Sequence, residues 1–281
     1  MRAFYYLLTA CNYNPYYCNP STYNHPTKGA TMKIIMIANQ KGGTGKTTTT
    51  LNLGTHLADA GLKVLMIDLD PQSSLTLATV SDCPGESMAE VLGGADPGTL
   101  TMAQVIKQIG TRLYLAPADI AMSSNEVYLN NRLMRELILQ QALEPIQNKF
   151  DVCLIDCSPS LSVLFINALR AAHGVISPTL PAALDLRGLR LFIDSLERTK
   201  KALNPNLVLI GVVICQYDQR LKLHKAALAQ LQNSGLPLFE TMISRSVRMA
   251  TSAGSGRAAP GELSNQYNQL SKEVMKWLKQ K

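Results

Sequence analysis

The feature that most constrains the fold lies between residues 34 and 48, where an apolar run leads into a loop with three glycines and then into consecutive threonines. The apolar run Ile34–Ala38 predicts a buried strand, and the threonines predict the first turn of a helix. Glycines let a backbone wrap closely around an anion, while the amides and dipole of a helix N-terminus attract negative charge. A strand, a glycine-rich loop and a helix in this order therefore predict a phosphate-binding site on an α/β fold.

The polar residues of this loop indicate a nucleotide rather than a simple turn. A structural turn would explain the glycines, but it would not require a lysine followed by a hydroxyl side chain. We expect Lys46 to reach the β- and γ-phosphates and the hydroxyl of Thr47 to ligate Mg²⁺.

From Lys33 onward the chain alternates short β-branched runs with longer stretches of helical spacing. The expected strands are Ile34–Ala38, Val64–Ile67, Leu113–Ala116, Val152–Ile155, Val175–Ser177 and Val208–Ile214. The expected helices are Thr47–Ala60, Asn125–Ile146, Ser162–Ala172, Leu189–Leu203, His224–Ser234 and Glu262–Lys279. Because apolar strands separated by helices are typical of parallel sheets, we expect an α/β fold with a mostly parallel, twisted sheet and helices on both faces. We interpret residues 32–281 as one domain, since 46% of the chain is hydrophobic and can bury a large core.

Residues 1–31 differ from everything that follows, because asparagine, proline and tyrosine dominate and no periodic pattern emerges. We expect a disordered or poorly ordered extension, and Met32 stands directly before the first strand as an alternative start. The apolar run before Cys11 is too short and too weakly charged for a normal export signal. No stretch approaches the roughly 18 apolar residues of a membrane span, and the six cysteines lack metal-site spacing. We therefore expect a soluble, cytoplasmic protein with reduced thiols.

Acidic residues follow two further apolar runs of the chain. Asp68 and Asp70 end the run that begins at Val64, and Asp156 ends the run that begins at Val152. Each acid alone fits a turn or a helix cap equally well. Because open α/β sheets bind ligands at the carboxyl ends of their strands, we expect these acids to complete the phosphate site.

The loop Lys41–Thr48 does not quite follow the general phosphate-loop pattern, because Gln40 occupies the place of the first glycine and Lys41 opens the loop. It resembles the deviant Walker A motif of the ParA/MinD family, also called the SIMIBI class of P-loop NTPases. The resemblance implies an ATPase that binds ATP and Mg²⁺ and whose Lys41 crosses a dimer interface to the partner's phosphates. A cation supplied in trans can neutralise charge on the transferred phosphoryl group and couples dimerisation to ATP. The implied nucleotide-binding residues are Lys41, Gly42, Gly43, Thr44, Gly45, Lys46, Thr47 and Thr48.

The acids also match motifs of this family. Asp68–Gln72 is similar to the A′ motif, which implies that Asp70 positions or activates the attacking water. Asp156 matches the Walker B aspartate, which implies that it holds Mg²⁺ together with Thr47. Ser158 stands where the family usually has a proline, and this leaves the carboxylate of Asp156 untouched. The implied catalytic residues are Lys41, Lys46 and Asp70, since hydrolysis here needs positioning and charge neutralisation rather than a nucleophilic side chain.

The net charge of +7 is confined to the last part of the chain. Residues 220–281 contain ten lysines and arginines against three glutamates, whereas the preceding residues are balanced. This distribution favours contact with a polyanion, either nucleic acid or an acidic lipid surface. A solvated basic helix without a partner is the alternative.

Weaker motifs extend the resemblance to chromosome and plasmid partitioning ATPases of the ParA/Soj type. Leu180–Leu189 is similar to the family's Pro…Glu-Gly-Leu segment, with Asp185 in place of the glutamate. The resemblance implies contacts of Arg220 and Arg248, and secondarily of Arg245, with DNA phosphates. The alternative is that these arginines cap helices or pair with acids.

The implied protein is a partitioning ATPase with weak intrinsic activity that dimerises on ATP, binds non-specific DNA and moves a plasmid, a chromosome or another cargo. Its implied partners are a second copy, DNA and a ParB-like adaptor, and its implied place is the nucleoid. A MinD-like regulator is one alternative, because Leu270, Val274, Trp277 and Leu278 could lay the last helix on anionic lipid. Others are a metabolic or metal-delivery enzyme on the same scaffold, and a positioner of a cargo other than DNA.

Overall fold

The computed structural model describes residues 31–80, 85–93, 98–245 and 261–280. These residues form a seven-stranded sheet with the strand order β3-β4-β2-β5-β1-β6-β7. All neighbouring strands are parallel except β3 and β4, which are antiparallel. The strands are β1 (Lys33–Ile37), β2 (Val64–Leu69), β3 (Lys107–Gln108), β4 (Leu113–Ala116), β5 (Val152–Cys157), β6 (Gly174–Thr179) and β7 (Val208–Ile214). The expected mostly parallel α/β sheet is therefore confirmed.

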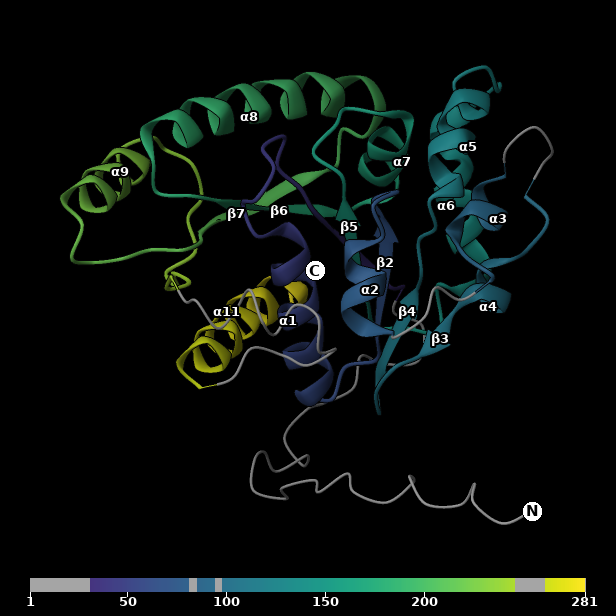
Figure 1. The fold of residues 1–281 in the computed structure, drawn as a ribbon, viewed down its shortest axis with the longest axis horizontal. Coiled ribbons are helices and arrows are strands. Elements are labelled where there is room, and N and C mark those ends of the chain that lie inside the picture. The colour runs from purple at the N-terminus through teal and green to yellow at the C-terminus, as the bar shows by residue number, and fades with distance from the viewer. Residues whose placement is uncertain (1–30, 81–84, 94–97, 246–260, 281) are drawn as a thin grey trace, which may run out of the picture.

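Helices cover both faces of this sheet (Figure 1). One apolar layer joins the sheet to α3 (Met88–Leu92), α4 (Met102–Val105), α5 (Ala121–Leu129), α6 (Ile138–Leu143), α7 (Val163–Ala171), α8 (Ala183–Leu203) and α9 (Lys222–Gln232). The other joins it to α1 (Lys46–Asp59), α2 (Ser74–Thr79) and α11 (Glu262–Leu278). The central strands β2 and β5 are buried at every position, as expected for strands covered on both sides.

The strand order places β1 between β5 and β6. The loop that follows β1 therefore lies beside the loops that follow β5 and β6. The end of β2 lies one strand further away, beyond β5. Asp68 of β2 and Asp156 of β5 are direct partners in the parallel register. The acids expected at the strand ends are thus brought to the same edge as the glycine-rich loop.

The prediction of one long helix over Asn125–Ile146 is wrong. The structure divides this stretch into α5, two short 3-10 turns (Arg135–Leu137 and Glu144–Ile146) and α6. Met134 adopts a left-handed conformation with φ of 55°, which a continuous helix does not allow. The Asn167 side chain donates to the carbonyl of Arg135 and accepts from the amide of Leu139, so it replaces the bond that these two groups would form in a helix.

One further expectation is wrong at its boundary, and four short elements had no prediction. Helix α8 begins at Ala183, six residues before the expected Leu189, and so includes Asp185. The short elements α2, α3, α4 and β3 were not anticipated, because each is too short to display a clear period.

The last helix lies against the protein rather than apart from it. Leu270 and Val274 are fully buried, and α11 packs beside α1 in the second apolar layer, where Trp277 and Leu278 also contact the core. The apolar face that a lipid surface would need is therefore used inside the fold. No helix within the described ranges is long and apolar enough to cross a membrane.

Candidate nucleotide-binding site

The phosphate loop connects the end of β1 at Ile37 to the start of α1 at Lys46. Gly43 and Gly45 have φ values of 73° and 95°, in the left-handed region that side chains other than glycine rarely adopt. A Cβ atom added to Gly42 or Gly43 would meet no atom within 4 Å, so the space above the loop is open. This open cradle, lined by backbone and ending at a helix N-terminus, fits a phosphate group.

A cavity of about 520 Å³ lies over this cradle. It brings together most of the residues expected from the sequence: Gly42, Gly43, Gly45, Lys46, Thr47, Thr48 and Asp70. Thr44 is buried and does not line the cavity, and its hydroxyl donates to the carbonyl of Lys41 at 3.4 Å. Lys41 and Asp156 also do not line the cavity. The side chain of Lys41 contacts Asp185, and Asp156 is buried in the core.

Lys46 is buried at the floor of the site. Its amine donates to the carbonyl of Lys41 at 3.2 Å. Burial lowers the pKa of Lys46, and the nearby carboxylate of Asp156 opposes this shift. A neutral carbonyl is a weak partner for the ammonium group of Lys46. A phosphate oxygen would be a stronger partner, because it is negatively charged.

Asp156 is the acid best suited to a cation. It is fully buried at the end of β5, its Oδ1 accepts from the hydroxyl of Thr50 at 3.4 Å, and its Oδ2 has no hydrogen-bond partner. Burial and the neighbouring Asp68 raise the pKa of Asp156, while Thr47 and Lys46 lower it. An orphaned, buried carboxylate oxygen on a residue that interacts with the hydroxyl of Thr47 fits a Mg²⁺ ligand set.

The described residues hold no group of three or more His, Cys, Asp or Glu side chains suited to a metal. Mg²⁺ would therefore depend on Thr47, Asp156 and the phosphates of the nucleotide itself, as is usual for this hard cation.

The two aspartates after β2 have different environments. Asp68 is saturated, because its carboxylate accepts from the amide and hydroxyl of Thr76 and from the amide of Asp70. These hydrogen bonds make Asp68 a structural residue that holds α2 against β2. Asp70 lines the cavity, and its Oδ1 accepts from the amide of Gln72 at 3.0 Å. Of the two, only Asp70 faces the space where a nucleotide would lie.

The family of the protein follows from comparison of its sequence with known proteins. Residues 32–209 match a family described as an AAA domain. The chain is 36% identical over 231 residues to the chromosome partitioning protein ParA of Caulobacter vibrioides, covering 80% of this chain and 85% of that one. It is 33% identical over 232 residues to the sporulation initiation inhibitor protein Soj of Bacillus subtilis, covering 80% and 89%. This chain belongs to the ParA/Soj-type ATPases.

A solved structure supports the same fold for this ParA/Soj-type ATPase. Cobyrinic acid a,c-diamide synthase from Mycobacterium smegmatis, with bound ATP analog and magnesium, has a TM-score of 0.77 and 32% sequence identity. The comparison covers 88% of this chain and 96% of that one. The ligands of that structure agree with the expectation of ATP and Mg²⁺ as cofactors.

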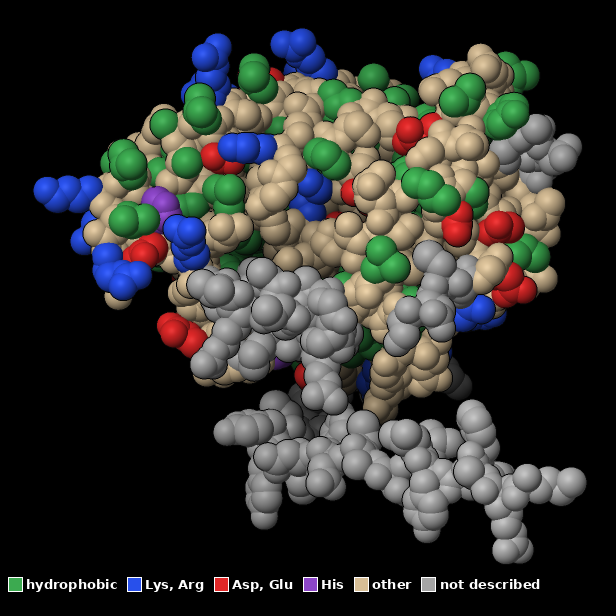
Figure 2. Space-filling model, viewed as in Figure 1, with side chains coloured by type: hydrophobic (Ala, Val, Ile, Leu, Met, Phe, Trp, Pro, Cys, Tyr) green, Lys and Arg blue, Asp and Glu red, His purple; other side chains and the backbone are tan. Residues whose placement is uncertain are grey.

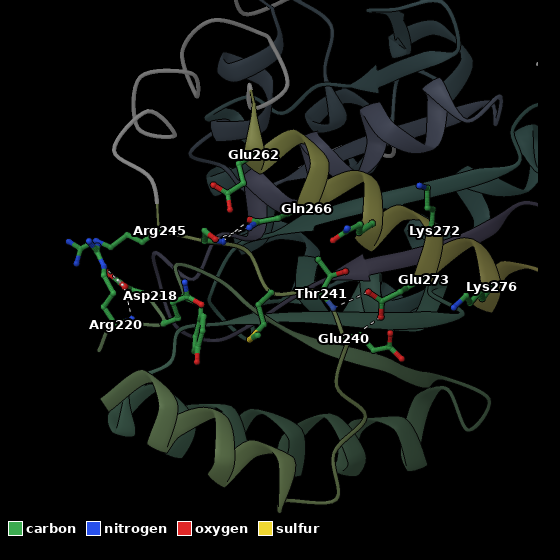
Figure 3. Close-up of a pocket in the computed structure, with 15 residues that line it drawn as sticks. Asp218, Arg220, Glu240, Thr241, Arg245, Glu262, Gln266, Lys272, Glu273 and Lys276 are labelled. Atoms are coloured by element: carbon green, nitrogen blue, oxygen red, sulfur yellow. Dashed lines mark hydrogen bonds and ion pairs between the residues drawn. The ribbon is translucent and has the colours of Figure 1, made fainter. Parts of the chain in front are cut away.

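The DNA contacts expected of the ParA/Soj-type ATPase involve three arginines, of which the structure describes two. Arg220 and Arg245 both line a groove of about 720 Å³ between the loop after β7 and α11, and they point to the same end of it (Figure 3). Arg220 is 85% exposed, yet it forms a two-pronged contact with Asp218 at 2.7 and 2.9 Å. Arg220 thus pairs with an acid, as the alternative predicted, but remains accessible. Arg248 lies outside the described residues.

Some residues at the site were missed by sequence reasoning. Cys215 and Gln216 line the nucleotide cavity, although the sequence predicts a functional role only for Arg220 in this part of the chain. The sequence gives Asp185 only the place of a glutamate in a family motif, yet its carboxylate is the partner of Lys41. No periodic or motif signal marks such contacts, because they join segments far apart in the sequence.

Proposed function

We propose that this ParA/Soj-type ATPase binds ATP and Mg²⁺, dimerises on ATP and in that state binds non-specific DNA. With a ParB-like adaptor it drives segregation of a plasmid, a chromosome or another cargo on the nucleoid in the cytoplasm. The observation that carries the proposal is the buried carboxylate of Asp156, whose Oδ2 is orphaned and which interacts with Lys46 and Thr47, two residues that line the cavity over the open glycine cradle. This arrangement suits a Mg²⁺-bound triphosphate better than a free anion.

In the proposed reaction Lys46 and the amides of residues 42–48 bind the phosphates. Thr47 and Asp156 hold Mg²⁺, which neutralises phosphate charge when bound. Asp70 orients the attacking water, and its position on the cavity wall supports that role. The water oxygen forms a bond to the γ-phosphorus while the bond from this phosphorus to the β–γ bridging oxygen breaks. ADP leaves with the bridging oxygen, and inorganic phosphate and a proton are released. Weak intrinsic hydrolysis is expected until DNA and the adaptor stimulate it.

Lys41 provides the link between ATP and dimerisation in this proposal. Its ammonium contacts Asp185 rather than its own cavity, and it is 45% exposed, so it is accessible to a second copy. In the dimer Lys41 exchanges Asp185 for the phosphates held by the partner. A cation supplied in this way makes the nucleotide part of the interface.

DNA binding is proposed through Arg220 and Arg245, with Arg248 as a further contact. Lys and Arg side chains gather around α9 and the adjoining end of the molecule (Figure 2), which supports this surface. Contacts between arginines and phosphates carry no sequence information directly and weaken steeply with salt.

DNA retention measured with ATP, ADP and no nucleotide across a salt series tests the proposal. We expect retention of unrelated duplexes only with ATP, with affinity that falls as salt rises. Equal retention in all three states, or none, would contradict the DNA assignment. A parallel arm with vesicles of anionic lipid distinguishes the MinD-like alternative, which predicts lipid binding with ATP and no DNA binding.

The likeness to a diamide synthase supports a second candidate, an ATP-dependent amide ligase. A ligase would consume ATP only when a carboxylic acid and an ammonia donor are both present. ATP turnover by the purified protein in the absence of both compounds favours the partitioning ATPase.

A further inference from the structure

The loop after β7, residues 215–220, contacts both the nucleotide cavity and the groove that contains the arginines. Cys215 and Gln216 line the cavity, whereas Tyr217–Arg220 line the groove. One short segment therefore has its two ends in two different sites. We name residues 215–220 the connecting loop.

The cavity end of the connecting loop rests on the phosphate loop at two points. A Cβ added to Gly45 would lie 3.5 Å from the sulfur of Cys215, so this side chain packs against the glycine. The side-chain amide of Gln216 donates to the carbonyl of Gly43 at 3.5 Å, the outer limit of a hydrogen bond. Gln216 also has a φ of 56°, a left-handed conformation that is costly for a residue with a side chain.

The groove end is joined to Arg245 by backbone hydrogen bonds, and it holds its own Arg220 through the carboxylate of Asp218. The amide of Tyr217 donates to the carbonyl of Ile243 at 2.9 Å, and the amide of Arg245 donates to the carbonyl of Tyr217 at 3.1 Å. The amide of Arg220 donates to Asp218 at 3.0 Å, and the same carboxylate holds the guanidinium. Arg220 and Arg245 are thus both held by hydrogen bonds of the segment that begins next to Gln216.

We infer that Gln216 is a positioning residue that couples occupation of the phosphate loop to the placement of Arg220 and Arg245. The carbonyl of Gly43 belongs to the backbone that must close on a triphosphate. When this carbonyl moves, the side-chain amide of Gln216 passes the movement on to Tyr217. From Tyr217 two backbone hydrogen bonds carry it to the segment that bears Arg245. Chains of hydrogen bonds between two sites can carry such coupling, and the connecting loop supplies one.

The inference rests on the proposed function for its DNA readout, but hydrogen exchange tests it without DNA. The variant Gln216→Gly removes the side chain and accepts the left-handed backbone, so it keeps the fold. Gln219→Ala is the matched control, because Gln219 lies on the same loop but lines only the groove. Exchange is measured at saturating Mg²⁺ and a non-hydrolysable ATP analog, so that a change in nucleotide affinity has no effect.

In the wild type and in Gln219→Ala, we expect nucleotide to slow amide exchange in residues 42–48, 217–220 and 243–245. In Gln216→Gly, the first segment should still respond and the other two should not. An unchanged response of the other segments in Gln216→Gly, or no response there in the wild type, would overturn the inference.

DNA affinity provides the second readout. The ratio of DNA affinity with ATP to that with ADP should fall toward one in Gln216→Gly, from the roughly 5- to 150-fold typical of coupled sites. A ratio that stays at the wild-type value in this variant would contradict the coupling. If the wild type itself retains no DNA, the proposed function fails and the exchange measurement alone decides the inference.

Discussion

The ammonium group of Lys41 lies 2.6 Å from Oδ1 of Asp185, a carboxylate that is almost completely buried in the first turn of α8. The lysine expected to reach the partner's phosphates is therefore held within its own subunit in this state. In the proposed ATP-bound dimer Lys41 leaves Asp185 for the partner's phosphates, so we expect this ion pair to oppose dimer formation.

Replacing Asp185 with Asn should favour the dimer, because Lys41 loses its partner while the volume of the side chain is kept. An ion pair with one exposed member contributes about 0.5–1 kcal/mol, which corresponds to a roughly two- to fivefold lower ATP concentration at half-dimerisation. Light scattering against ATP concentration measures this shift. The double variant Lys41→Ala/Asp185→Asn should fail to dimerise, and a need for more ATP in Asp185→Asn would refute the opposing role of the pair.

Changing Lys46 to Ala should abolish nucleotide binding, since the buried amine beneath the cradle is the expected phosphate ligand. We expect a loss of at least about 100-fold in ATP affinity, in line with removal of a charge-assisted contact worth about 3 kcal/mol. Titration calorimetry provides the measurement. Lys149→Ala is the control, because this exposed lysine lies before the amino end of β5, at the opposite edge of the sheet. Unaltered ATP affinity in Lys46→Ala would refute the phosphate-loop assignment.

Asp70→Ala should slow hydrolysis while sparing ATP binding, because Asp70 lines the cavity without belonging to the phosphate cradle. Loss of a group that positions or activates water reduces turnover by about 10²- to 10⁴-fold. The variant should accumulate as an ATP-bound dimer, which light scattering and phosphate release would detect together. A variant that remains monomeric with ATP would count against this role.

Charge reversal at Arg220 and at Arg245 should weaken DNA binding and leave dimerisation intact. Removal of one arginine–phosphate interaction should also reduce the slope of log affinity against log salt by about one. Fluorescence anisotropy with a labelled duplex at several salt concentrations measures both effects. Arg112→Glu, at an exposed position just before β4, serves as the control for net charge. Full binding by both variants at moderate salt would remove these arginines from the interface.

The buried acids predict a stability that falls with rising pH when nucleotide and Mg²⁺ are absent. Burial raises the pKa of Asp156 to about 8, so the folded state binds more protons than the unfolded state above the ordinary value near 4. The free energy of unfolding should therefore decline between about pH 4 and 8, by at most about 1.4 kcal/mol per pH unit for each proton. Urea unfolding across this range measures the decline. Asp156→Asn should flatten the profile, and a wild-type stability that rises with pH would contradict the prediction.

Much of the nucleotide site could be predicted from the sequence, because its parts are local. The glycines at positions 43 and 45 adopt the left-handed conformations that the loop requires, and Lys46 follows directly in the first turn of α1. Apolar runs that end in an acid located the strands β2 and β5. By contrast, the break between α5 and α6 depends on the side chain of Asn167, which belongs to another helix. No local sequence pattern predicts this break.

Local patterns along the chain were enough to predict the strand–loop–helix unit, the parallel sheet and the acids at the strand ends. All of these follow from the conformational preferences and burial of neighbouring residues. Three contacts became visible only in the folded chain: Lys41 with Asp185, Gln216 with Gly43, and the apolar face of α11 with α1. Those contacts join residues far apart in the chain, and their formation depends on the strand order that brings the segments together.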